Sequence, residues 1–157
     1  MVQRYGTPIV TEARIVVDVD APPEKTWTAI SDPRNLPRWD RHITRVAGVP
    51  EDGLHPGDRY ETELQFMGVR GVVEAEVLEF DPPRHSKILL RGFIEAVVTS
   101  RVEPLPHGRS RIVHVVQYGF RGGPVGQLAA RALRVTGGPQ LVLRRGTLAQ
   151  KRQIEQG

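Results

Sequence analysis

The chain of 157 residues contains no cysteine, so it forms no disulfide, has no thiol nucleophile and cannot hold zinc through cysteine. It also lacks a run of about 18 apolar residues, which a membrane-spanning helix would need. The first ten residues do not contain the apolar core of a signal peptide. Together these absences predict a cytoplasmic protein without a membrane span.

Several motifs of large enzyme classes are also missing. The sequence has no G-x-S-x-G nucleophile elbow, no P-loop and no G-x-G-x-x-G dinucleotide fingerprint. Its five histidines do not show the spacing of metal ligands. We therefore expect neither a metal nor a cofactor.

Charge is unevenly distributed along the chain. From Arg121 onward there are seven basic residues and one acid, Glu155, whereas the rest of the chain is slightly acidic. A basic segment of this kind could bind nucleic acid or anionic lipid. A solvated helix face is the commoner explanation for charge patterning, so we do not expect nucleic acid as a partner.

Composition and length are those of one globular domain. Apolar residues make up 39% of the chain and charged residues 25%. A domain commonly holds about 100–150 residues, so we expect a single domain over residues 1–157. The sequence does not indicate whether the protein is a monomer or a homodimer.

Alternation of apolar and polar residues predicts most of the secondary structure. Strands are expected over residues 12–19, 59–67, 70–80, 86–93, 94–102 and 111–120. Pro22 and Pro23 begin a helix, which ends before Pro33, and a second short helix covers 35–39. Helical spacing from Val125 predicts a long final helix, with a break at 137–139. The order is one strand, two short helices, about six strands and one long helix, an α+β arrangement.

Five motifs in this order resemble the START-like (SRPBCC) superfamily, in particular its polyketide cyclase/dehydrase-like and Bet v 1-like members. They are V-D-A-P-P-E-K-T-W-x-x-I-S-D-P with N-L-P-R-W-D behind it, P-G-D-R-Y, E-F-D-P-P-R, G-R-S-R-I-V-H and a terminal L-x-x-K-R-x-I-E. The resemblance covers nearly the whole chain. Most of the motif residues form turns and helix caps, so they indicate fold more strongly than function.

The resemblance implies a helix-grip fold. In this fold a curved seven-stranded antiparallel sheet is closed at one end by two short helices, and a long C-terminal helix lies across its concave face over a cavity. Small residues at expected inward positions agree with such a hollow, namely Ala75, Gly92, Ala96 and Ser100. The alternative is that larger neighbours fill the space, as in most protein interiors.

Two residues are candidates for catalysis. His114 and Tyr118 share the inward face of the last strand with apolar residues. A half-buried imidazole can accept and return protons near neutral pH, and a phenol could orient or polarise a carbonyl. Both residues could instead be core residues with one satisfied hydrogen bond.

Seven further residues are expected to contact a ligand: Trp39, Phe66, Ala96, Ser100, Val116, Leu141 and Arg145. A helical wheel anchored at Leu141 places Arg145 on the inward face, where it could meet a carbonyl or an anion. Such an arginine more often extends past the apolar edge to water. Trp39 could line the mouth of the cavity or anchor its short helix in the core.

Three functions remain open on this evidence. The first is a cofactor-independent cyclase, dehydratase or other lyase that acts on a polyketide-like or other hydrophobic substrate. The second is a non-catalytic carrier of a hydrophobic ligand of the lipid, quinone or polyphenol type. The third is an interaction module that uses the basic C-terminal helix.

Overall fold

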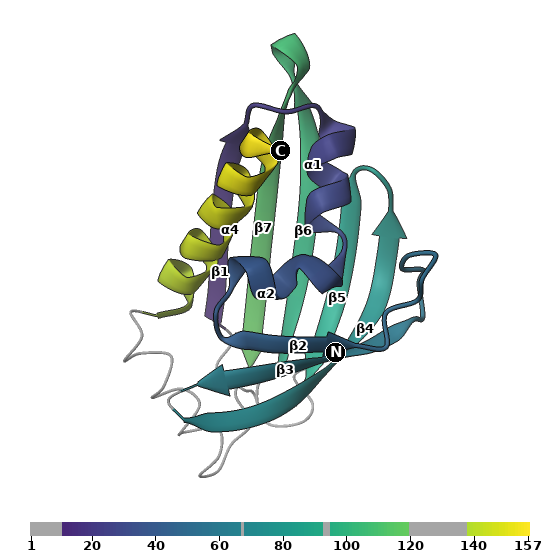
Figure 1. Ribbon diagram of the computed structural model, residues 1–157, viewed down its shortest axis with the longest axis vertical. Coiled ribbons are helices and arrows are strands. Elements are labelled where there is room, and N and C mark those ends of the chain that lie inside the picture. Colours follow the sequence, from purple (N-terminus) through teal and green to yellow (C-terminus); the bar gives the residue numbers. More distant parts are fainter. Residues whose placement is uncertain (1–10, 67, 93–94, 120–137) are drawn as a thin grey trace.

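A curved antiparallel sheet wraps partly around one long helix (Figure 1). The computed structural model describes residues 11–66, 68–92, 95–119 and 138–157. Its strands are β1 (Thr11–Val19), β2 (Ile43–Ala47), β3 (Arg59–Phe66), β4 (Val69–Asp81), β5 (His85–Arg91), β6 (Glu95–Leu105) and β7 (Arg109–Gly119). They form a seven-stranded sheet in the order β1-β7-β6-β5-β4-β3-β2, and each neighbouring pair is antiparallel.

The described helices lie on the concave side and at the ends of the strands. They are α1 (Pro23–Ile30), the 3₁₀ turn η2 (Pro33–Asn35), α2 (Leu36–Trp39), the 3₁₀ turn η3 (Pro106–Gly108) and α4 (Gly138–Gln156). In Figure 1, α1 and α2 lie beside α4 over one face of the sheet. The predicted α+β, helix-grip architecture is confirmed.

Curvature of the sheet creates the space beneath α4. Strands β2 and β3 run across the direction of β6 and β7 in Figure 1. Register shifts between Val77 and Glu79 in β4, and between Ile43 and Arg45 in β2, insert extra residues into the ladder. Such bulges bend a strand and increase its twist, so they help the sheet to curl.

The short helix α1 is fastened to the sheet by buried polar contacts as well as by packing. Ser110 Oγ donates to the carbonyl oxygen of Ala21 at 2.8 Å, and Thr26 Oγ1 lies 2.7 Å from Ser110 Oγ. Because the serine proton is used for Ala21, the threonine hydroxyl donates to the serine oxygen. Trp27 packs against Phe80 with 5.5 Å between ring centroids. These contacts close one end of the sheet, as expected from the proline-bounded helices.

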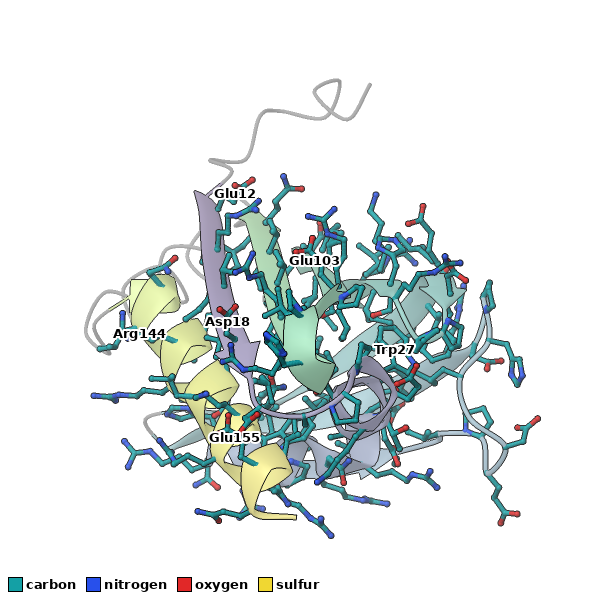
Figure 2. All side chains as sticks on the ribbon, turned by 90° about the horizontal axis from the view of Figure 1, so that it is seen from above. Glu12, Asp18, Trp27, Glu103, Arg144 and Glu155 are labelled. Atoms are coloured by element: carbon teal, nitrogen blue, oxygen red, sulfur yellow. The ribbon has the colours of Figure 1, made fainter. Side chains whose placement is uncertain are left out.

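Helix α4 covers the free edge of β1. The Gln140 side chain donates to the carbonyl oxygen of Arg14 at 2.6 Å and accepts from the Arg14 N–H at 3.0 Å. Further along, Lys151 Nζ donates to the carbonyl oxygen of Asp18 at 2.8 Å. Figure 2 shows Asp18 on β1 and Glu155 on α4, the two elements that these bonds join. The helix thus supplies partners to backbone groups that an edge strand leaves unpaired.

The glycine-proline segment does not divide the helix that the structure describes. The described part of the helix runs from Gly138 to Gln156 and includes Pro139. The helical segment expected over residues 125–136 lies outside the described residues. Within the described part of the chain, no helix is long and apolar enough to cross a membrane.

The C-terminal end of α4 depends on one apolar anchor. Ile154 is 3% exposed and packs in a core cluster with Val19, Ala21 and Ile112. We expect Ile154→Ala to lower the free energy of unfolding by about 2–5 kcal/mol, the usual range for truncating a buried isoleucine. Chemical denaturation measures this loss. The matched control is Arg152→Ala on the exposed side of the same helix, which should change stability by less than about 0.5 kcal/mol; equal losses would contradict the packing.

Candidate functional site

A cavity of about 350 Å³, partly open to solvent, lies between the concave face of the sheet and the helices. Most of its lining is apolar, including Trp39, Leu54, Phe80, Ile88 and Val116. The polar lining residues are Ser31, Asp40, Tyr60, Thr62, Ser86, Ser100, His114, Tyr118, Thr147 and Gln150. An apolar cavity of this volume with a few polar groups suits a small, largely hydrophobic ligand.

The sheet brings His114 into a chain of hydrogen bonds. Its Nε2 lies 2.9 Å from Gln150 Oε1, and its Nδ1 lies 2.8 Å from Ser100 Oγ. Since a carbonyl oxygen can only accept, Nε2 carries the ring proton and donates it to Gln150. Nδ1 therefore accepts from the Ser100 hydroxyl. One serine, one neutral imidazole and one amide from β6, β7 and α4 are linked across the cavity.

Burial keeps this imidazole neutral. His114 is 6% exposed, and desolvation lowers the pKa of its side chain, although the hydrogen bond with Gln150 acts in the opposite direction. Desolvation also raises the pKa of Tyr118 to about 12, so its phenol keeps its proton. The pKa of Tyr60 is raised for the same reason. The cavity therefore offers neutral donors and acceptors at these three positions.

Trp39 serves as both wall and anchor. Its ring lines the cavity, its side chain is buried, and its Nε1–H donates to Gln153 Oε1 on α4. Beside it, Asp40 Oδ1 accepts from the backbone N–H of His42 and lies 2.9 Å from His42 Nδ1. Within the described residues, no group of three His, Asp or Glu side chains is placed to hold a metal ion.

Six of the nine predicted site residues line the cavity: Trp39, Ala96, Ser100, His114, Val116 and Tyr118. Phe66 belongs to β3, but its side chain is outside what the structure describes. These placements are consistent with ligand contact, and the individual roles stay predictions. Of the small inward positions expected, Gly92 is exposed rather than facing the cavity.

The prediction that Leu141 and Arg145 lie on the cavity-facing side of α4 was wrong. Leu141 is half-buried outside the cavity lining, and Arg145 is exposed. The side of the helix that faces the cavity carries Val142, Leu143, Gly146, Thr147 and Gln150. The rotation of α4 follows from its contacts with β1, such as those of Gln140 and Lys151, which the helical period of the sequence does not specify. Arg144 and Arg152 of the basic segment are exposed as well.

Most polar residues of the cavity lining were not among the predicted site residues, including Tyr60, Thr62, Ser86, Thr147 and Gln150. The alternation in residues 59–67 did place Tyr60 and Thr62 on the inward face, and their polarity was the available signal. No signal in the sequence identifies Gln150, because its role depends on which side of α4 meets β7.

The fold and the cavity define a helix-grip protein with a largely apolar hollow between sheet and helices. The family model described as "Polyketide cyclase / dehydrase and lipid transport" matches residues 10–144. The chain belongs to this family. No curated protein matches the sequence.

Solved structures of similar fold come from several bacteria. A protein of Thermus thermophilus is 17% identical with a TM-score of 0.73, covering 92% of this chain and 97% of that one. A START superfamily protein of Mycobacterium smegmatis is 17% identical with a TM-score of 0.69, covering 92% and 97%. The Zhui aromatase/cyclase of a Streptomyces species is 16% identical with a TM-score of 0.68, covering 93% and 92%. At such identities the likeness shows the fold alone.

The lowered pKa of His114 makes stability depend on pH. Below about pH 6.5 the unfolded chain protonates this histidine while the folded protein resists it, so folding stability falls as pH decreases from there towards the folded pKa. Each pH unit in that window costs up to about 1.4 kcal/mol. Urea unfolding at several pH values measures the slope.

Two variants test this assignment. His114→Phe should flatten the decrease that the parent protein shows below about pH 6.5, where an unfolded histidine becomes protonated. His55→Gln, which removes an exposed histidine, should keep the decrease of the parent protein. A His114→Phe variant with an unchanged slope would show that another group causes the effect.

Proposed function

We propose that this protein is a cytoplasmic, cofactor-independent cyclase or dehydratase that acts on a polyketide-like or other largely apolar small molecule. The observation that carries the proposal is the neutral imidazole of His114, held between Ser100 and Gln150 in an apolar cavity. The family description, polyketide cyclase/dehydrase and lipid transport, is consistent with it. The chemistry of His114 and its neighbours gives further support.

His114 Nδ1 is the base. Rotation of the Ser100 hydroxyl releases the Nδ1 lone pair, which takes a proton from the carbon next to a substrate carbonyl. In a dehydration the electron pair of that C–H bond forms the new C=C bond, and the β-hydroxyl leaves as water with the proton returned by the imidazolium. In an aldol cyclisation the pair forms the new C–C bond, and the proton ends on the oxygen of the attacked carbonyl. Neither reaction needs an oxidant or a reductant.

The surroundings of His114 suit a base that must also return its proton. The lowered pKa keeps Nδ1 unprotonated before the reaction and makes the imidazolium a stronger acid, which returns the proton more readily afterwards. Gln150 Oε1 accepts the Nε2–H in both states and so holds the ring in one orientation. The apolar walls would fold a flexible substrate into a reactive geometry, which can itself supply much of the rate enhancement.

A non-catalytic carrier of a hydrophobic ligand is the second candidate. The observation that favours it is that both ring nitrogens of His114 already have protein partners, so the imidazole satisfies the hydrogen-bonding needs of the cavity wall without any substrate. In that case His114, Ser100 and Gln150 orient a bound molecule and transfer no proton.

The two candidates are separated with an aryl β-hydroxyketone, whose loss of water produces a conjugated enone that absorbs in the near ultraviolet. We expect the parent protein to accelerate this reaction and His114→Phe to lose at least about 100-fold of the acceleration, the lower range for general acid–base catalysis. The phenylalanine keeps the ring volume, so thermal shift with the enone product should still detect binding.

Thr99→Val is the matched control, since Thr99 neighbours Ser100 on β6 but does not line the cavity. It should leave the rate unchanged. Full turnover in His114→Phe would contradict the assigned base. Binding without turnover in the parent protein would favour the carrier. If lipids, quinones and polyphenols all fail to raise the melting temperature, both candidates are wrong.

A further inference from the structure

Four buried hydroxyl groups line the cavity without a hydrogen-bond partner among the described residues. They belong to Tyr60, Thr62, Ser86 and Tyr118, each at most 7% exposed. Among the described residues, every side-chain N or O atom that is inaccessible to solvent has a hydrogen-bond partner. The four unpartnered oxygens are therefore accessible, and their residues line the cavity. A hydroxyl that faces a largely apolar pocket and has no protein partner can bond to water or to a ligand oxygen in that pocket. Each of the four is therefore available to a ligand oxygen.

Strand register sorts these hydroxyls into two groups. Ser86, Ser100 and His114 are direct cross-strand neighbours on β5, β6 and β7, which makes one polar row. The second row runs from Tyr60 through Ala75, Leu90 and Ala96 to Tyr118, from β3 to β7. Thr62 lies two residues from Tyr60, on the same face of β3. The second row thus has a tyrosine at each end, with small and apolar side chains between them.

An apolar row separates the two polar rows. Ile88, Val98 and Val116 are paired across β5, β6 and β7, and all three line the cavity. Tyr118 follows His114 by four positions on β7, which corresponds to about 13 Å between their Cα atoms at ~3.3 Å per residue. The cavity therefore has two polar ends with an apolar middle.

Helix α4 spans the same two rows from the opposite wall, with a polar residue at the first row only. Gln150 contacts His114 at the first polar row, and Leu143 packs against the cluster of Ala96 and Tyr118 at the second. Gln150 follows Leu143 by seven positions, which corresponds to a rise of about 10 Å along the helix axis at ~1.5 Å per residue. Gly146 lies between them and lines the cavity, so the helix leaves room over the apolar row.

We infer that the cavity selects a neutral molecule with an oxygen function at each end of a flat or rod-like apolar body. One hydroxyl or carbonyl oxygen binds at the first polar row (Ser86, Ser100 and His114), and the other binds at the Tyr118 end of the second row, on β7. This inference rests on the proposed function for the existence of a bound small molecule, but it does not require turnover. It assigns Tyr118 to anchoring the end of the ligand that lies away from His114.

A series of three rigid probes tests this two-ended geometry: trans-stilbene, trans-stilbene with one para hydroxyl, and trans-stilbene with a para hydroxyl on each ring. Fluorescence titration gives the dissociation constant of each. We expect the two-ended probe to bind roughly three- to tenfold more tightly than the one-ended probe, the gain expected of one additional net hydrogen bond. The unsubstituted hydrocarbon should bind most weakly.

Two variants locate the ends. Ser86→Ala and Tyr118→Phe each remove one cavity hydroxyl, and each should weaken the two-ended probe by roughly three- to tenfold. The one-ended probe has a single hydroxyl to place, so only one of the two variants should weaken it. Thr99→Val removes a hydroxyl outside the cavity lining and should leave all three dissociation constants unchanged.

Equal affinity for the one-ended and two-ended probes would overturn the inference, as would failure of all three to bind. The probe series on the parent protein alone decides this if a variant fails to fold. Dehydration of the aryl β-hydroxyketone is measured separately, so loss of the two-ended selectivity leaves the proposed chemistry standing. Conversely, if the protein shows no turnover but keeps its selectivity for the two-ended probe, the inference stands and the protein is a carrier of such a ligand.

Discussion

The whole arrangement depends on holding α4 over a concave sheet that the helix does not fill. A helix above an open space loses the close packing that normally attaches it to a sheet. Here the attachment is concentrated at the edges. Gln140 and Lys151 bond to the backbone of β1, and Ile154 packs into the core at the C-terminal end. Because these contacts support the helix on one side and at one end, its middle can present Gly146 to the cavity.

The same helix also completes the polar chain of the site. Gln150 is buried on α4, and its amide oxygen decides which nitrogen of His114 carries the proton. Any shift of α4 along β1 would therefore change both the volume of the cavity and the tautomer of the imidazole. The contacts that hold α4 in place therefore also position the residues of the site. The antiparallel register of β5, β6 and β7 positions the remaining polar residues of the site, because it aligns Ser86, Ser100 and His114 in one row.

Local patterns predicted the architecture well where one face of an element is apolar. The alternation in β1, β3 and β4 gave strands whose ends lie within about two residues of those observed, as boundary uncertainty allows. Strand β2 (Ile43–Ala47) was not located, because it is short, carries a register shift and exposes Thr44 and Arg45. The inward side of α4 was misplaced because the helical period does not fix how the helix is rotated against β1 and the cavity.

The sequence by itself determined the family, the order of the elements other than β2, and the inward positions of His114, Tyr118 and Ser100. These follow from periods of two residues and from proline-bounded turns. Only the tertiary structure decided that Gln150 meets His114 and that Tyr60 and Tyr118 end the same row, from strands far apart in the chain. Such contacts depend on strand register and on the rotation of α4. Both are set by packing between distant segments, which no local pattern of residues encodes.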